Sequence, residues 1–187
     1  RLKQAAAAVG QCSIMNLYGK FFHDYDKKIA QILLNAEDIE TEEKKENLTN
    51  TFDALLELGV IPIVNENDSV SYTEIESEDR LFGDNDMLSA VVAVLCRARR
   101  LVILSDIDGF YDSDPRLHPD AKLIERVDTI DEYTLSLAGG AGSRRGTGGM
   151  KTKLQAAKLA TAQGIDTSIT NGKDPSALYE LVNSGKA

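Results

Sequence analysis

The stretch VIPIVNEND at residues 60–68 sets the pattern on which the fold of this chain rests. Its first half, residues 60–64, is a short apolar run of the kind that forms a strand buried on both faces of a sheet. The stretch RLVILSD at residues 100–106 repeats this pattern, because its apolar run at residues 100–104 also ends in polar residues. Both runs therefore predict strands of a parallel sheet that lead into polar loops.

Helical and strand patterns alternate on both sides of these two runs. Residues 87–96 are apolar nearly all round, which predicts a helix packed against a sheet rather than one facing water. Alternating strands and helices predict βαβ units, and hence an α/β fold with a mostly parallel central sheet and helices on both faces. The other predicted helices are residues 2–23, 42–58, 129–137, 150–163 and 175–183, and the other predicted strands are residues 28–34, 122–127 and 166–170.

Composition limits the classes of protein to which the chain can belong. Its 187 residues are 42% hydrophobic, which suits one domain or most of one. The 30 acidic against 21 basic residues give a net charge of -9, the wrong sign for a general nucleic-acid binder. Cys12 and Cys96 lie in apolar, helix-like stretches, which predicts buried, reduced thiols. We therefore expect a cytoplasmic protein with neither nucleic acid nor a membrane as its partner.

Two polar loops occupy positions where ligands bind in such folds, beyond the carboxyl ends of strands. Residues 65–68 carry four consecutive hydrogen-bonding side chains. They could bind the amine and the carboxylate of a small molecule, or form an Asx-rich turn. Residues 82–86 open the apolar helix, where Asp84 or Asn85 can act as the cap. Asp84 and Asp86 together are more than a cap requires, although both could simply complement the helix dipole.

The third loop, residues 105–111, follows a buried strand. A calcium loop is excluded, because Gly109 comes too early and no glutamate follows at the required offset. The loop instead suits the nucleotide side of a site, with Ser105 and Asp106 near phosphates or ribose and Tyr111 near the base.

The fourth loop, GTGGMKTK at residues 146–153, places glycines immediately before a helix. Backbone N–H groups at such a helix start can approach phosphate oxygens, although the spacing matches neither the P-loop nor the dinucleotide fingerprint. On a helical wheel, Lys153 lies beside the inner stripe that begins with Met150 and Leu154. A solvated lysine is the ordinary alternative, but a structural cation would prefer the other end of the helix.

Five segments, taken together and in this order, resemble the amino-acid kinase family, and within it the members that phosphorylate glutamate. The resemblance implies a three-layer αβα sandwich, in one amino-acid kinase domain over residues 1–187. It also implies ATP-dependent phosphorylation of the γ-carboxylate of L-glutamate to glutamyl 5-phosphate, the first step of proline biosynthesis. Mg²⁺ would accompany ATP with no metal ligand assigned in the chain, and the protein would be a homo-oligomer. The segments are residues 3–11, 65–68, 83–86, 105–111 and 146–153.

The resemblance also implies roles for individual residues. Asn65, Asp68 and Asn85 would bind glutamate, while Asp86 would orient catalytic lysines. Lys153 would neutralise charge on the transferred phosphoryl group. A carboxylate is already a nucleophile at neutral pH, so the reaction needs no general base. The nucleotide would be bound by Ser105, Asp106, Thr147, Gly148, Gly149, Met150, Lys151, Thr152 and Lys153.

The chain departs from the family pattern at its start. The family's first strand, a second catalytic lysine and a Ser-Gly substrate loop would precede residue 1, so we expect the chain to lack the family's N-terminal part. By itself it would then have little or no kinase activity, and no second domain is expected within it. The family is inhibited by proline, and the acidic segment 69–82 is the expected place of that response.

Three other hypotheses stay open. Another member of the same family would act on a different acid, a nucleoside monophosphate or carbamate, although the loops at residues 65–68 and 83–86 favour glutamate. A non-catalytic module would bind proline or nucleotide at the same sheet edge. A structural fragment would contain no intact site.

Overall fold

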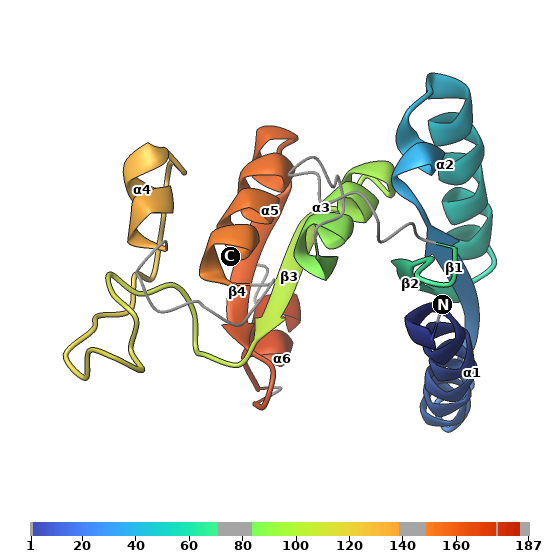
Figure 1. Cartoon of the computed structure of the whole chain (residues 1–187), viewed down its shortest axis with the longest axis horizontal. Coiled ribbons are helices and arrows are strands. Elements are labelled where there is room, and N and C mark those ends of the chain that lie inside the picture. Colours follow the sequence, from blue (N-terminus) through green and yellow to red (C-terminus); the bar gives the residue numbers. More distant parts are fainter. Residues whose placement is uncertain (1, 71–83, 139–148, 175, 184–187) are drawn as a thin grey trace. The chain divides into compact units, whose positions relative to one another are not determined.

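The computed structural model describes residues 2–70, 84–138, 149–174 and 176–183 (Figure 1). The chain divides into two units, Arg1–Phe82 and Gly83–Ala187, each with its own strands, helices and buried residues. Of the sequence-based expectations, the roles of Thr147 and Gly148 and most of the segment assigned to proline lie outside the described residues.

The first unit contains a βαβ arrangement. Strand β1 (Lys28–Leu34) pairs in parallel with β2 (Val60–Glu66), and the 3-10 helix η1 (Ala36–Ile39) and helix α2 (Glu42–Glu57) connect them. Helix α1 (Leu2–His23) precedes β1. Thr41 caps α2 by accepting a hydrogen bond from the backbone N–H of Lys44, and Gly59, at φ 69°, ends it just before β2. These elements match the predicted order.

The second unit places the remaining helices around a second parallel pair. Strand β3 (Arg100–Ser105) pairs with β4 (Asp166–Asn171), in register from Arg100↔Asp166 to Ser105↔Asn171. Both strands therefore end at the same edge of the sheet. The helices of this unit are α3 (Asn85–Leu95), α4 (Glu132–Leu137), α5 (Met150–Ala162) and α6 (Ser176–Asn183).

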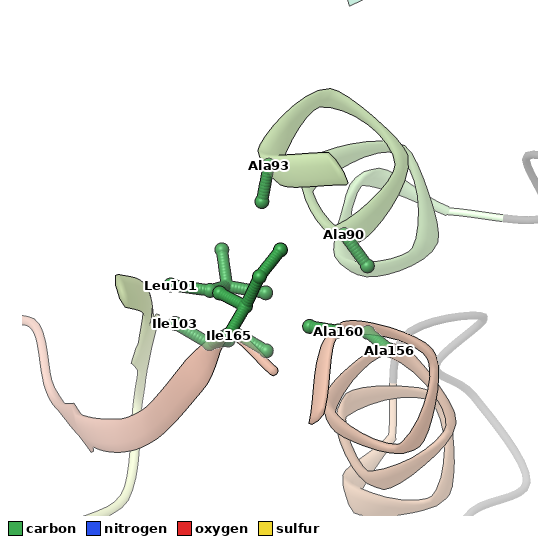
Figure 2. Packing of buried hydrophobic residues seen from close by; sticks show 7 residues of the cluster. All are labelled: Ala90, Ala93, Leu101, Ile103, Ala156, Ala160 and Ile165. Carbon is green, nitrogen blue, oxygen red and sulfur yellow. The ribbon is translucent and has the colours of Figure 1, made fainter. Parts of the chain in front are cut away.

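The core of the second unit lies between α3, α5 and the strand pair. Figure 2 shows Ala90 of α3 facing Ala156 and Ala160 of α5, while Ala93 of α3 points toward the isoleucine and leucine side chains of the sheet region. Ala90, Ala156 and Ala160 have no exposed surface. Side chains this small let two helices approach closely, so the alanines fix the distance between α3 and α5. The sheet-side residues of this cluster are Leu101, Ile103 and Ile165.

The predicted strand at residues 122–127 was wrong. Only Leu123 takes part in β structure there, in an isolated antiparallel bridge with Tyr111. The backbone N–H of Ile124 also donates to the carbonyl oxygen of Phe110 at 2.8 Å, so the segment lies against the loop that follows β3. Its apolar residues Leu123, Ile124 and Val127 suggested a strand, but the neighbouring chain is a short loop that cannot continue a ladder.

The α/β class with parallel strands is confirmed, since both described strand pairs are parallel. Helix and strand boundaries shift by a few residues: α3 starts at Asn85 rather than at residue 87, because Asp84 caps it, and β2 continues to Glu66. Within the described part of the chain, no helix is both long and apolar enough to cross a membrane. The interpretation of residues 1–187 as one domain stays a prediction.

Candidate active site

Helix α3 begins with an acidic, capped turn. Asp84 is the N-cap, and its Oδ1 accepts hydrogen bonds from the backbone N–H groups of Asp86 at 3.1 Å and Met87 at 3.2 Å. Its Oδ2 is buried and has no hydrogen-bond partner among the described residues. Asn85, the first residue of the helix, is exposed. The cap thus fixes the backbone of Asp86 and leaves one buried acceptor of Asp84 available to a ligand.

Asp86 and Lys153 form an ion pair that joins α3 to α5. The Lys153 Nζ donates to Oδ2 of Asp86 at 2.8 Å and to Oδ1 at 3.2 Å. Only 13% of the Lys153 side chain and 14% of the Asp86 side chain are exposed. Charges so shielded from water interact more strongly than surface pairs, and their geometry is better defined. The first turns of the two helices therefore carry a fixed pair of opposite charges.

Thr152 contacts the same carboxylate. Its Oγ1 lies 2.9 Å from Oδ2 of Asp86 and 2.8 Å from the carbonyl oxygen of Gly149. Consecutive residues of α5 thus both contact Asp86, one with a neutral donor and one with a charged donor. The sequence resemblance gave Thr152 only a nucleotide contact.

Helix α5 starts without a side-chain cap. Gly149 is its N-cap, with φ −82° and ψ −179°, and has no side chain to accept from the first turn. Backbone N–H groups in the first turn of a helix have no partner within the helix, and the dipole makes this end positive. Met150 is half-buried, whereas Lys151 is exposed. This start can bind an anion such as a phosphate beside Lys153.

The nucleotide residues predicted after β3 lie at its carboxyl end. Ser105 is the last residue of β3 and is half-buried. Asp106 is exposed, and its Oδ2 accepts from Nη2 of Arg116 at 2.8 Å. Both of these charged side chains are more than half exposed, so the pair adds little to stability and can open to admit a ligand.

The ends of β3 and β4 are connected by side chains and backbone. Nδ2 of Asn171 donates to Oδ1 of Asp108 at 2.8 Å, and the N–H of Gly172 donates to the carbonyl oxygen of Ser105 at 2.8 Å. The hydroxyl of Tyr111 lies 3.4 Å from Oδ2 of Asp108. Partial desolvation, followed by the charge and hydrogen bond of Asp108, raises the pKa of Tyr111 above 10.0. These contacts hold the loop in one shape.

The predicted glutamate loop of the first unit forms a turn after β2. Asn65 is half-buried within β2, and Asp68 is exposed in the turn. The backbone N–H of Asn67 donates to the carbonyl oxygen of Leu34 at 2.9 Å, and its side-chain oxygen accepts from the hydroxyl of Ser69 at 2.6 Å. The hydrogen bonds of Asn67 therefore stabilise the turn, while the polar side chains of Asn65 and Asp68 lie at the end of the strand.

The sequence pointed to most of these residues but missed Asn171 and the orphan oxygen of Asp84. A signal for Asn171 was present, because residue 171 directly follows the strand predicted at residues 166–170, just as Ser105 follows the strand predicted at residues 100–104. For Asp84 the sequence suggested a cap, and capping uses only one of its two oxygens. Asp86, Thr152 and Lys153 are brought together by the structure, as the resemblance implied for Asp86 and Lys153.

Comparison with known proteins places these features in a family. The family model described as "Amino acid kinase family" matches residues 1–171. A glutamate 5-kinase of Clostridium perfringens is 55% identical over 183 residues, covering 98% of this chain and 68% of the relative. One from Enterococcus faecalis is 46% identical, covering 96% of this chain and 66% of the relative. One from Caldanaerobacter subterraneus is 46% identical, covering 98% of this chain and 48% of the relative.

The chain thus spans between about half and about two-thirds of the length of these relatives, with coverage from 48% to 68%. Among solved structures, an isopentenyl phosphate kinase matches with a TM-score of 0.60 at 18% sequence identity, covering 94% of this chain and 63% of that chain. Identity this low shows the fold alone, and it agrees with the α/β kinase fold predicted from the sequence.

Proposed function

The chain belongs to the amino acid kinase family, and from this premise we propose that it transfers the γ-phosphoryl group of ATP to the γ-carboxylate of L-glutamate. The products are glutamyl 5-phosphate and ADP, so the reaction is the first step of proline biosynthesis. The observation that carries the proposal is the shielded Asp86–Lys153 pair at the start of α5. The relatives that the chain matches along nearly its whole length are glutamate 5-kinases.

The chemistry needs alignment and positive charge more than it needs proton transfer. A γ-carboxylate oxygen forms a bond to the γ-phosphorus while the bond from that phosphorus to the β–γ bridging oxygen breaks. Both reactants are negatively charged, so a fixed cation beside the transferred group lowers the barrier. Lys153 supplies that cation, and Asp86 holds its side chain against the helix start.

Glutamate recognition is assigned to the polar groups that open α3 and follow β2. The buried Oδ2 of Asp84, which lacks a partner among the described residues, is an acceptor for the substrate ammonium. Asn85 is exposed and is available to the substrate carboxylates. Within the first unit, Asn65 and Asp68 carry polar side chains at the end of β2, and we assign them the glutamate-binding role that the family resemblance implies.

ATP is assigned to the start of α5 and the end of β3. Gly149 presents an uncapped helix start to the phosphates, and Ser105 and Asp106 lie at the carboxyl end of a strand, where ligands bind in this fold. Mg²⁺ would enter with the nucleotide phosphates and neutralise part of their charge. Within the described residues no group of three or more histidine, cysteine or carboxylate side chains is arranged to hold a metal ion.

The decisive experiment measures phosphorylated product with ATP·Mg²⁺ and glutamate. ADP release is followed in a coupled assay, and the acyl phosphate is trapped with hydroxylamine, which separates kinase turnover from ATP hydrolysis. The assay is run on the 187-residue chain and on the chain joined to the segments of the Clostridium perfringens relative with which it does not align. Glutamine, which lacks the γ-carboxylate, should give no product.

Lys153→Met should abolish glutamate-dependent turnover, whereas Lys158→Met should leave it unchanged. Both lysines are on α5, but Lys158 is exposed. If neither the 187-residue chain nor the extended chain forms product although both are folded, the glutamate assignment is ruled out. ATP binding without turnover in both would favour a non-catalytic nucleotide-binding module, and turnover with another acid would favour a different family member.

Regulation and assembly complete the proposal. We assign proline as a feedback inhibitor that competes with glutamate, and a homo-oligomer as the working form. A cytoplasmic location suits a reaction that consumes ATP, and neither Cys12 nor Cys96 is in a disulfide. Cys96 is half-buried, whereas Cys12 is exposed rather than buried as its apolar surroundings predicted. Inhibition by proline that rises with glutamate concentration, instead of falling, would contradict the competitive site.

A further inference from the structure

The hydroxyl of Thr152 donates a hydrogen bond to the carboxylate of Asp86, the acidic partner of the Asp86–Lys153 ion pair. We propose that Thr152 is a positioning residue, which orients the carboxylate of Asp86 so that Lys153 faces the transferred phosphoryl group. This role rests on the kinase function proposed above, and it differs from the nucleotide contact that the family resemblance implies.

The single hydroxyl proton of Thr152 has two acceptors within reach, Oδ2 of Asp86 at 2.9 Å and the carbonyl oxygen of Gly149 at 2.8 Å. The Gly149 oxygen already accepts backbone N–H groups from Thr152 at 3.1 Å and from Lys153 at 3.4 Å. It is therefore satisfied without the hydroxyl. A carboxylate is the stronger acceptor, so the proton is directed at Asp86.

Other contacts of Asp86 fix its backbone but not the plane of its carboxylate. Its N–H donates to Oδ1 of Asp84 at 3.1 Å, and its carbonyl oxygen accepts from the hydroxyl of Ser89 at 2.6 Å. The torsion that turns an aspartate carboxylate is broad and has no sharp rotamer wells. Donors on the carboxylate oxygens must therefore set its plane, and among the described residues Thr152 is the neutral donor to them.

The plane of the carboxylate determines where Lys153 directs its remaining N–H group. An ammonium has three N–H donors, and the structure directs Lys153 Nζ at both oxygens of Asp86. The third donor is then left for a phosphoryl oxygen. If the carboxylate turns, the ammonium turns with it, and the third donor is no longer aligned with the charge that develops in transfer. Such a loss lowers kcat and leaves substrate binding nearly intact.

The test compares Thr152→Val, which keeps the shape and removes the hydroxyl, with Thr152→Ser, which keeps the hydroxyl. Thr152→Val should lower kcat roughly ten- to a hundredfold, the effect of losing a hydrogen bond to a charged group. The KM values for ATP and glutamate should change by less than about threefold, and Thr152→Ser should recover most of kcat. Thr152→Ala serves as the second variant if the valine variant does not fold.

Thr161→Val is the matched control. Thr161 is also on α5, but its hydroxyl donates to the backbone carbonyl oxygens of Ala157 at 2.8 Å and Lys158 at 3.3 Å. Its kcat should equal that of the unsubstituted protein. A rise in KM for ATP with unchanged kcat in Thr152→Val would show that Thr152 contacts the nucleotide, and would overturn the proposal. An unchanged kcat and KM would also overturn it.

A measurement that does not depend on turnover separates this proposal from the function on which it rests. Urea unfolding of Thr152→Val, Asp86→Asn and the double variant gives the coupling between the two side chains. We expect the double variant to depart from additivity by at least roughly threefold in the unfolding equilibrium constant. Additive effects would refute the contact. A protein with no glutamate-dependent turnover but with this coupling would refute the proposed function alone.

Discussion

The ion pair between Asp86 and Lys153 should be strongly coupled in stability as well as in activity. At the observed 2.8 Å, two unit charges in a medium of effective dielectric constant of about 20 attract by about 6 kcal/mol. Much of this attraction is offset by desolvation, because only 13% and 14% of the two side chains are exposed. We therefore expect a net coupling free energy of about 2–3 kcal/mol, at the upper end of the range for residues in contact.

The coupling is measured with Asp86→Asn, Lys153→Met and the double variant, by urea unfolding followed by circular dichroism. The double variant should be destabilised less than the sum of the two single variants, because each single variant leaves a shielded charge without its partner. Arg126 and Asp128 provide the control cycle, since they form a 2.7 Å pair with side chains 85% and 77% exposed. Their coupling should be below about 1 kcal/mol. Equal coupling in the two cycles would refute the argument that shielding makes the site pair special.

Three further expectations follow from the packing and the caps. Ala160→Leu should lower the free energy of unfolding by about 1–3 kcal/mol, measured by urea titration, since Ala160 has no exposed surface, whereas Ala162→Leu on the exposed side of α5 should change it little. Phe52→Ala should cost about 3–5 kcal/mol, because Phe52 is 0% exposed; a loss below about 1 kcal/mol would contradict its core position. Hydrogen bonds from the Thr134 backbone N–H and hydroxyl hold the pKa of Asp131 below 3.8. The contribution of Asp131 to stability is therefore present above pH 3.8 and is lost as the pH falls through its lowered pKa. Asp131→Asn should therefore flatten the loss of stability as the pH falls below 3.8.

The sequence predicted the parallel strands because they are encoded locally. Apart from Arg100, residues 60–64 and 100–104 are apolar on both faces, and polar residues follow each run. The pattern alone therefore placed β2 and β3 to within one or two residues at their ends. The segment at residues 122–127 failed for the opposite reason. Its pattern resembled a strand, but whether a strand forms depends on a partner, and among the described residues the segment pairs only with the short loop near Tyr111.

The sequence predicted which residues form the site but not how they contact one another. The loop patterns and the family resemblance singled out Asp86, Lys153 and Thr152, but the bond between Thr152 and Asp86 joins residues 66 positions apart. No local pattern reveals such a contact. The resemblance therefore gave Thr152 the same nucleotide-binding role as its neighbours in the chain. Only the geometry distinguishes a residue that contacts the nucleotide from one that orients another side chain.

The alanine interface explains why these distant residues meet. Asp86 precedes Ala90 by one helical turn, and Thr152 precedes Ala156 by the same step, so each polar residue lies on the face that carries the next buried alanine. The close contact of α3 and α5 at Ala90 and Ala156 extends one turn toward the helix starts and there brings Asp86 to Thr152 and Lys153. A larger side chain in that interface would separate the helices and lengthen the site hydrogen bonds together. Stability and catalytic geometry therefore share one structural cause in this unit, and a substitution such as Ala160→Leu should reduce kcat in a protein that still folds.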